Sequence, residues 1–305
     1  MEDIQNQFYN IHIHAALIIQ KRMIDQVDMK EYVRQITTYI QYIDHLYIYN
    51  YTNQDLNEFY QMLKKYEHIS FTNCEDFGQV TNYQIIYEQL LETQADFGMI
   101  MEQGYYFEEN ALLTLRRYLV ENDHTNIAVA TLMPLRGCEV LERQAEKVRP
   151  CMGCNFVGAL LNLKLFKELG GFKLEYYQTT FDYEYCIRAR LKGYSILLFQ
   201  NEVLRNSNYY LIEKRILFFK LSTFDYDLMD VYYQTRNRFY LWDEYATLDA
   251  KYVKMDKKLY KAERHELKVR DPNYRDKFYM MEEARFDYVR GLKGKYKGGQ
   301  KSEKN

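Results

Sequence analysis

Short apolar runs alternate with longer segments of helical periodicity along the first two thirds of the chain. Residues 14–19, HAALII, are too short and too rich in β-branched side chains for a helix, so they predict a buried strand. Residues 29–42 instead carry apolar side chains at helical spacing. The same reasoning predicts further strands at 46–49, 69–72, 97–101, 127–131, 156–161 and 195–199, and further helices at 56–66 and 80–93.

Strands that alternate with helices at this spacing predict βαβ units. The expected fold class is therefore α/β, with a mainly parallel sheet flanked by helices. The crossovers of such a sheet are right-handed, and ligands bind beyond the carboxyl ends of its strands. The residues that directly follow each strand are therefore the first candidates for a binding site.

The last third of the chain has a different pattern. From Tyr209 the apolar spacing predicts helices almost to the end, interrupted at residues 271–272, Asp-Pro. We therefore expect an α/β domain over residues 1–208 and a helical extension over residues 209–290 that packs on it. Residues 291–305 are rich in Gly and Lys and are expected to form a flexible basic tail.

Composition narrows the classes of function. The chain has 305 residues, an apolar share of 47% and a formal net charge of −2. The apolar share suffices for a packed core, and the charge argues against nucleic acid as a partner, since nucleic-acid binders show a basic field. No run approaches ~18 apolar residues, so no membrane span is expected. The polar start MEDIQNQFYN does not resemble a signal peptide, so we expect a cytoplasmic protein.

The cysteines are odd in number, and thiols are the expected state inside a cell. Residues 151–154, Cys-Met-Gly-Cys, have the spacing of a zinc knuckle or a redox pair. Zinc requires four ligands, and no second pair of this kind accompanies the first. Free thiols are therefore expected here, with a metal or redox role as the alternative.

Polar residues follow the second and third predicted strands. Asn50 and Thr52 lie in the turn after residues 46–49, where base stacking on Tyr49 or Tyr51 and a purely structural turn are equally open. After the third strand, Gly78 permits a tight turn next to Asp76, and Asn82 lies in the first turn of the next helix. The free N–H groups of that helix start suit a phosphate. The alternative is a helix cap with Asp76 as the capping residue.

An acidic turn, Asp182-Tyr183-Glu184, precedes a helix that carries Arg188. A partly desolvated carboxylate near a sheet edge has a raised pKa, which suits a general base that deprotonates a hydroxyl group. Asp182 is the candidate for this base. The alternative is that Asp182 caps the helix and that Glu184 and Arg188 form a surface ion pair four residues apart.

Two longer stretches carry a resemblance to a known family. Residues 156–196 contain Leu-Gly-Gly-Phe at 169–172, the acidic turn at 182–184 and the following Cys-Ile-Arg, and residues 231–240 contain Tyr-Tyr-Gln-Thr-Arg-Asn. Together they resemble the family 2 glycosyltransferases of the GT-A fold, in their rhamnosyltransferase-like branch. The resemblance extends over about residues 10–240 and implies a GT-A-like (Rossmann-like) sheet with a helical C-terminal extension.

The resemblance implies an inverting transfer of a sugar from a nucleotide-sugar donor to a hydroxyl group of a glycan or glycoprotein, in polysaccharide biosynthesis. It implies catalytic roles for Asp182, as base, and for Glu184. The residues that it implies near the donor are Asn50, Thr52, Asp76, Asn82, Glu102, Arg205 and Arg236.

The donor side departs from the family pattern. The family's Asp-x-Asp motif reads Glu102-Gln103-Gly104, so only Glu102 retains a carboxylate. We expect either Mn²⁺ or Mg²⁺ bound weakly through Glu102, or metal-independent binding in which basic residues meet the diphosphate. The basic candidates are Lys21, Arg22 and Arg205.

A second class of function stays open because of this departure. The chain could be a catalytically inactive relative that binds glycan or serves as the partner of an active transferase, and a homodimer is a further alternative. Residues 255–290 are amphipathic and are expected to cover the domain. Contact of the basic tail with the inner face of a membrane is the alternative.

Overall fold

The computed structural model describes residues 11–23, 25–208, 211–216 and 219–298. The strands of its central sheet are β1 (Ile13–Ile19), β2 (His45–Asn50), β3 (Ile69–Asn73), β4 (Phe97–Glu102), β5 (Tyr105–Phe107), β6 (Ile127–Arg136), β7 (Val148–Pro150), β8 (Leu160–Asn162) and β9 (Ser195–Asn206). The helical segments against this sheet are α2 (Gln26–Thr37), η2 (Ile40–Tyr42), α3 (Asn57–Leu63), α4 (Gln79–Leu91), α5 (Ala111–Glu121), α6 (Leu163–Leu169), η3 (Leu174–Tyr176) and α7 (Phe181–Leu191). The chain then forms a hairpin and three helices: β10 (Leu211–Ile216), β11 (Phe219–Phe224), α8 (Leu228–Tyr245), α9 (Ala250–Arg270) and α10 (Tyr274–Val289).

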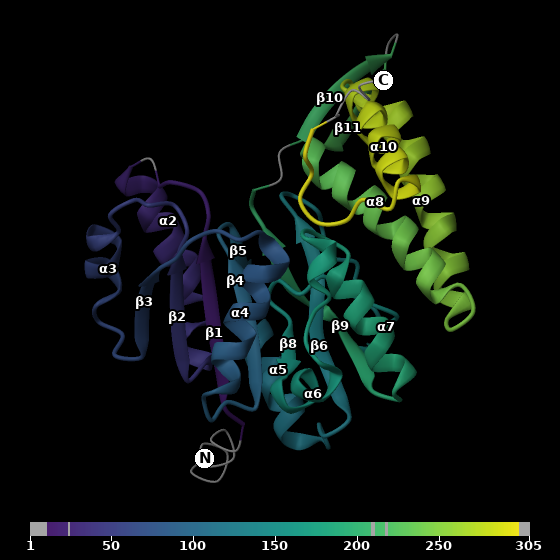
Figure 1. Ribbon diagram of the computed structural model, residues 1–305. Helices are drawn as coiled ribbons and strands as arrows, with labels where there is room; N and C mark the ends of the chain where they lie inside the picture. The colour runs from purple at the N-terminus through teal and green to yellow at the C-terminus, as the bar shows by residue number, and fades with distance from the viewer. Residues whose placement is uncertain (1–10, 24, 209–210, 217–218, 299–305) are drawn as a thin grey trace.

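The central sheet is mixed, with helices on both faces (Figure 1). Among the described residues its strand order is β3-β2-β1-β4-β8-β6-β9-β5, and β7 pairs with β9. The pairs β1/β2, β2/β3, β1/β4 and β6/β9 are parallel, whereas β8 runs antiparallel to both of its neighbours. The N-terminal half is therefore a βαβ sheet, whose crossovers place α2, α3 and α4 beside it.

The side chains of β1 show how the sheet divides the core. Alternate residues of a strand point to opposite faces. Ile13, Ala15 and Leu17 belong to the apolar cluster that α2, α3 and α5 cover. Ala16 and Ile18 belong to the cluster on the other face, under α4, α6 and α7. Both sets are buried, which is why this strand reads as a continuous apolar run rather than an alternating one.

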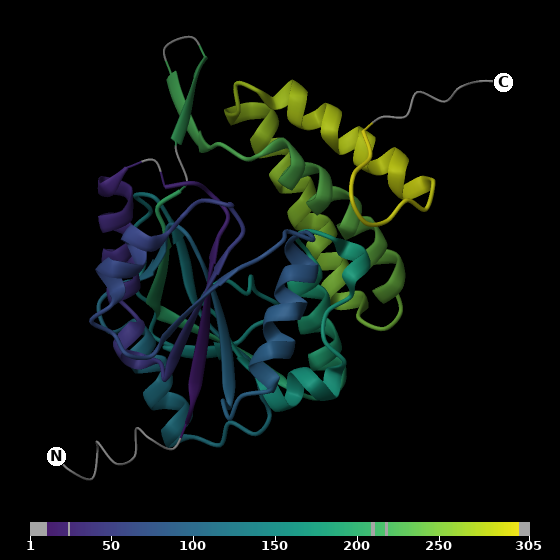
Figure 2. The ribbon, with the colours of Figure 1, turned by 60° about the vertical axis from the view of Figure 1, so that its left-hand side comes forward.

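The C-terminal helices pack beside the second of these faces (Figure 2). Trp242 of α8 and the α9 residues Tyr252 and Tyr260 belong to the same buried cluster as the side chains of α4, α6 and α7. The indole N–H of Trp242 donates to Asp256 at 2.7 Å, which satisfies the polar atom of the buried ring. The extension thus shares its core with the sheet.

The predicted fold class is confirmed, and most of its strands lie where the apolar runs predicted them. The prediction of a strand at 156–161 is wrong: β8 comprises only Leu160–Asn162 and is antiparallel to its neighbours. Gly158 has φ of +69° and Phe156 precedes it in a loop, with one isolated bridge from Val157 to Ile100. A backbone turn at Gly158 interrupts the apolar run, which spacing alone does not reveal.

The prediction of continuous helix from Tyr209 is also wrong. Residues 211–216 and 219–224 pair with each other as an antiparallel hairpin, and α8 begins only at Leu228. Tyr209 itself lies outside the described residues. The predicted interruption at 271–272 is confirmed, since α9 ends at Arg270. Of the predicted tail, residues 299–305 lie outside the described part of the chain.

No helix in the described part of the chain combines the length and the apolar character that crossing a membrane would need.

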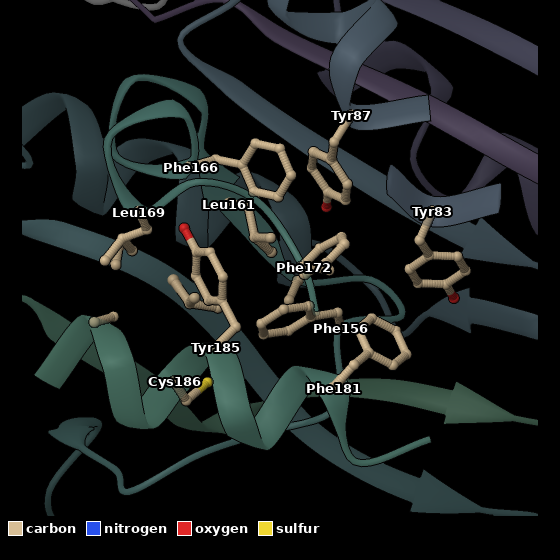
Figure 3. Close-up of a cluster of buried hydrophobic side chains, with 14 of the residues drawn as sticks. Tyr83, Tyr87, Phe156, Leu161, Phe166, Leu169, Phe172, Phe181, Tyr185 and Cys186 are labelled. Carbon is tan, nitrogen blue, oxygen red and sulfur yellow. The ribbon is translucent and has the colours of Figure 1, made fainter. Parts of the chain in front are cut away.

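A cluster of aromatic rings packs between α4, α6 and α7 (Figure 3). Phe172 lies at its centre, with ring centroids 5.0 Å from Phe166, 5.1 Å from Phe181 and 5.7 Å from Tyr185. Edge-to-face contacts of this kind add to the apolar area that each ring buries.

We predict that Phe172→Ala lowers the free energy of unfolding by about 3–5 kcal/mol, because it leaves a cavity among rings that cannot collapse fully. Urea denaturation followed by circular dichroism measures the change. Phe77→Ala is the control, since that ring is 52% exposed and its loss should matter by about 0.5 kcal/mol or less. Equal losses in the two variants would contradict the packing described here.

Candidate functional site

A hollow of about 250 Å³ lies at the carboxyl ends of β1 and β4. This is the edge at which α/β sheets bind their ligands. Its walls come from the segments that follow β1 and β4, from the end of β9 and from the start of α8, and they include Lys21, Glu102, Gln103, Asn208 and Asp230. We call this space the strand-end hollow.

Glu102 ends β4, and neighbouring side chains hold its carboxylate. The Tyr83 hydroxyl donates to Glu102 Oε1 at 2.8 Å, and Gln79 Nε2 donates to the same oxygen at 3.3 Å. Burial raises the pKa of Glu102, and the nearby Asp230 carboxylate raises it further. The two hydrogen bonds and the Lys21 ammonium group oppose that rise. The carboxylate therefore faces the hollow with one oxygen already engaged.

Gln103 holds the loop that carries Lys21. Its side-chain oxygen accepts hydrogen bonds from the backbone N–H groups of Gln20 at 3.0 Å and Lys21 at 2.8 Å. Its side-chain nitrogen donates to the Lys21 carbonyl at 2.9 Å. Three hydrogen bonds from one side chain thus join the end of β4 to the end of β1. They position Lys21 at the wall of the hollow.

Gly104 occupies the position where the family pattern has its second carboxylate. Its φ of +87° favours glycine, and a Cβ atom there would lie 2.3 Å from Asn208 Nδ2. Asn208 in turn donates from Nδ2 to the Gln103 carbonyl at 2.6 Å. The amide of Asn208 therefore fills the space that a side chain at position 104 would need.

Acidic residues at the start of α8 form the opposite wall. Asp225 pairs with Lys277 at 2.8 Å, and Asp227 caps α8 by accepting from the Met229 N–H at 2.7 Å. Asp230 accepts from Gln178 Nε2 at 2.6 Å. Burial raises the pKa of Asp230, and the Asp227 carboxylate adds to the rise. Lys277 is shared between Asp225 and the buried Asp271, so this wall keeps a net negative charge, which the raised pKa of Asp230 lessens.

The residues of the hollow do not by themselves form a complete set of ligands for a divalent cation. Magnesium and manganese require several convergent oxygen ligands. Within the described ranges, no three His, Cys, Asp or Glu side chains are grouped so that they could hold a metal ion. Glu102 is held by Tyr83 and Gln79, and Gly104 offers no ligand. The ligand set of a family metal site is therefore incomplete here.

Asn50 and Thr52, in the turn after β2, have their polar atoms engaged in hydrogen bonds within that turn and with Asn73. Asn50 Nδ2 donates to the Gln54 carbonyl at 2.9 Å and to Asn73 Oδ1 at 2.8 Å. Asn50 Oδ1 accepts from the N–H of Thr52 at 3.0 Å and from its hydroxyl at 2.7 Å. Asn50 and Thr52 thus form a closed turn, which is the structural alternative of the sequence analysis. Both lie outside the lining of the strand-end hollow.

Asp76 and Asn82 form a similar closed network in the loop before α4. Asp76 Oδ1 accepts from Asn82 Nδ2 at 2.7 Å and from the Gly78 N–H at 2.9 Å. Asn82 is fully buried, and its oxygen accepts from the Phe77 N–H at 3.1 Å. The Tyr177 ring packs against Gly78. These side chains shape the loop, and neither is among the residues that line the hollow.

Asp182 lies in the first turn of α7 and is 3% exposed. Its Oδ1 accepts from the N–H of Tyr183 at 2.9 Å, and burial raises the pKa of Asp182 to about 7. It is not among the lining residues of the strand-end hollow. The ring of the neighbouring Phe181 meets the Tyr83 ring edge to face at 5.4 Å (Figure 3), and the Tyr83 hydroxyl donates to Glu102. The structure therefore does not bring Asp182 and Glu102 together.

Glu184 is fully buried within an ionic network. Its carboxylate accepts from Arg188 at 2.8 and 2.9 Å and from the Tyr245 hydroxyl at 2.5 Å, and it lies 3.1 Å from Lys173 Nζ. Arg188 also donates to the carbonyls of Leu169 at 2.6 Å and Gly171 at 2.7 Å. The pair joins α7 to the preceding glycine turn and to α8, and it is not a surface pair.

The two arginines expected near the donor are also held elsewhere. Arg205 pairs with Glu108 and donates to the carbonyl of Gly137 at 2.7 Å. Arg236 is 1% exposed and stacks on the rings of Tyr232 and Tyr233, at 5.3 and 5.1 Å from their centroids. Neither lines the strand-end hollow.

Sequence reasoning missed several residues of the hollow: Gln103, Asn206, Asn208, Asp225, Asp227 and Asp230. Asp225 and Asp227 directly follow β11, and Asp227 and Asp230 bracket a helix start. Acidic residues before an apolar periodic run are a helix-start signal, but the prediction of continuous helix from Tyr209 obscured it.

Comparisons with known proteins identify the fold. No family model and no curated protein sequence matches the chain. Among solved structures, GalNAc-T7 with UDP, GalNAc and Mn²⁺ is similar over 65% of this chain and 44% of its own, with a TM-score of 0.52 and 9% identity. The mannosyltransferase PcManGT from Pyrobaculum calidifontis, with GDP-Man and Mn²⁺, is similar over 75% of this chain and 62% of its own, with a TM-score of 0.50 and 8% identity. The chain thus spans less than two thirds of either structure, and it shares the GT-A fold with both.

We predict that Gly104→Ala destabilises the protein more than Gly170→Ala does. Both positions have positive φ, +87° and +80°, so both substitutions carry backbone strain of about 1 kcal/mol. Only the methyl group at 104 meets a side chain, that of Asn208, whereas nothing lies within 4 Å of position 170. Urea denaturation measures the difference. Adding Asn208→Ala to Gly104→Ala should recover the excess loss, and no recovery would mean that Asn208 does not occupy this space.

Proposed function

Since the chain has the GT-A fold, we propose that it transfers a sugar from a nucleotide-sugar donor to a hydroxyl group of a glycan or glycoprotein acceptor, with inversion at the anomeric carbon. The resemblance of residues 156–196 and 231–240 places the proposal in the rhamnosyltransferase-like branch of family 2. The main observation in support of sugar transfer is the strand-end hollow. It lies where α/β sheets bind ligands, and Lys21 is in its wall.

Lys21 is the residue that we propose to meet the donor diphosphate. Opposite unit charges ~4 Å apart attract by about 4 kcal/mol at an effective dielectric constant of 20. The acidic wall opposes this attraction, because Lys277 is shared by Asp225 and the buried Asp271. Burial raises the pKa values of Glu102 and Asp230, which lessens that opposition. The incomplete ligand set supports donor binding without a cation.

Asp182 is the proposed base. With a pKa of about 7, the carboxylate is about half ionised at neutral pH and can accept a proton from a hydroxyl group. The loop before α7 is joined to the hollow by Gln79, which accepts from the Thr179 N–H at 3.2 Å and donates to Glu102 at 3.3 Å. The proposal requires an acceptor site that reaches both Asp182 and the strand-end hollow, because Asp182 does not line that hollow.

An inactive relative that binds a glycan or a partner subunit is the second candidate. Two observations favour it. Asp182 is bound to its own helix, away from the hollow, and the polar atoms of Asn50, Asp76 and Asn82 are engaged within their own turns. The two candidates differ in whether a nucleotide-sugar binds at all.

We predict that calorimetry detects binding of at least one UDP-, GDP- or dTDP-sugar without added Mn²⁺. Lys21→Ala should weaken this binding by about tenfold or more, since it removes an ion pair to phosphate. Lys30→Ala, at an exposed lysine of α2, is the control and should bind as the wild type does. If no nucleotide-sugar of the panel binds, with or without Mn²⁺, the result would favour the inactive relative.

We predict that Asp182→Asn lowers kcat by about 10²–10⁴-fold while the donor Kd changes little, because only the proton acceptor is lost. The kcat/KM of the wild type should rise with pH up to about 7 and then level off, since the base must be ionised. Radiolabelled sugar transfer over pH 5–9 measures both.

The matched variant is Asp230→Asn, which removes a carboxylate that does line the hollow. If Asp230→Asn abolishes transfer and Asp182→Asn does not, the base is Asp230.

A stability measurement tests the environment of Asp182 independently of activity. Its pKa is raised on folding, so the stabilisation present below pH ~4 is lost as pH rises through about 7. Asp182→Asn should therefore be most stabilising, relative to the wild type, above pH 7.

A further inference from the structure

The acidic side chains of α9 near its start and middle are engaged by partners from other helices. Asp256 accepts from the Trp242 indole at 2.7 Å and lies 3.3 Å from Arg238. Glu263 pairs with the same arginine on its other side. Asp249, which caps α9, lies 2.7 Å from Arg190, in an ion pair without hydrogen-bond alignment. Two arginines, Arg190 and Arg238, thus offset part of the charge of these three carboxylates.

Five lysines of α9 lie on the solvent-exposed side of the helix. Lys251, Lys254, Lys257, Lys258 and Lys261 are all exposed. The last four line an open hollow of about 470 Å³ whose floor is apolar, formed by residues 246, 250 and 253. Lys257 lies over the Trp242 ring at 5.4 Å, and within the described part of the chain none of the five forms an ion pair. A strongly basic surface thus exists on a chain whose net charge is −2.

Aliphatic side chains lie beside two of these lysines, Lys251 and Lys258, which are four and three residues from Met255. Met255 and Leu259 are one helical turn apart on α9 and are 43% and 48% exposed, and Leu248, just before the helix, is 61% exposed. We call these three residues and the five lysines the α9 basic face. It lies on the C-terminal helices, at the edge of the molecule (Figure 1).

We propose that the α9 basic face docks the protein on the surface of an anionic lipid bilayer. Clustered lysines on a helix are attracted to anionic headgroups, and exposed aliphatic side chains insert at the boundary between headgroups and acyl chains. A soluble polyanion would use the lysines alone and would leave Leu248, Met255 and Leu259 in water. The combination of charge and aliphatic surface therefore favours lipid.

Docking through α9 would also orient the strand-end hollow. α9 follows α8 directly, and the first turn of α8 carries Asp227 and Asp230, which line that hollow. The hollow would then be held at a set distance from the bilayer. The inference itself does not depend on sugar transfer, because binding to vesicles is measured without a substrate.

The test is sedimentation of the whole protein with vesicles of phosphatidylcholine alone or with about one third phosphatidylglycerol. We expect binding only to the anionic vesicles, weakening as salt is raised. The charge-reversal variant Lys251→Glu, Lys254→Glu, Lys258→Glu, Lys261→Glu should weaken the partition coefficient by about 100-fold or more, since each lysine near such a surface contributes about fivefold. Lys257 is left in place because of its contact with Trp242.

The matched control reverses four exposed lysines elsewhere, Lys30, Lys64, Lys164 and Lys167, and so has the same net charge. It should bind anionic vesicles within about threefold of the wild type. Equal loss in both variants, or no binding by the wild type, would overturn the proposal. Circular dichroism verifies that each variant is folded.

A second pair of measurements separates lipid from a soluble polyanion. Met255→Ser with Leu259→Ser should weaken binding to anionic vesicles several-fold and leave binding to dextran sulfate unchanged. If the wild type binds dextran sulfate as tightly as vesicles, and the serine variant binds vesicles normally, the face recognises soluble polyanions and the bilayer proposal is wrong.

Discussion

The carboxylate of Glu184 is the interaction on which much of the second half of the structure depends. It has no solvent exposure, so its charge must be compensated by the protein. Arg188, Lys173 and Tyr245 provide that compensation from three different segments. Removing one partner of such a buried pair typically costs about 3–5 kcal/mol, because the other charge is left uncompensated. The network therefore specifies how α7, the loop after α6 and α8 meet.

The position of α8 has consequences for the hollow. Its last turn supplies Tyr245 to the Glu184 network, and its first turn supplies Asp227 and Asp230 to the wall of the strand-end hollow. One helix thus connects the buried ionic network with the candidate site. The resemblance implied a catalytic role for Glu184, and its contacts are instead those of a residue that organises the fold around the site.

Residues 102–104 differ from the pattern that the sequence resemblance implies. Where the family pattern has two carboxylates, this chain has Glu102 and Gly104. The structure explains why Gly104 is compatible with its surroundings: its backbone has positive φ, and Asn208 occupies the space of the missing side chain. Residues 102–104 thus offer one carboxylate, and Gln103 between them fixes the loop that carries Lys21.

What the sequence by itself determined is the fold class and the order of the early elements. The strand β1 follows from a short apolar run rich in β-branched side chains, and the helix α4 follows from apolar side chains at a spacing of 3.6 residues. These patterns involve only residues close together in the chain, so a single sequence suffices to predict the elements. They fail where a turn interrupts an apolar run, as Gly158 does in the segment predicted as a strand.

Only the tertiary structure decided which polar side chains face the hollow. Asn50, Asp76 and Asn82 follow strands, as candidates should, yet their hydrogen bonds close within their own turns. Gln103 and Asn208 showed no motif, and their roles arise from contacts with residues 82 and 105 positions away along the chain. A polar side chain satisfies whichever partner the fold brings within reach, and sequence spacing does not encode that partner when it lies on a distant strand.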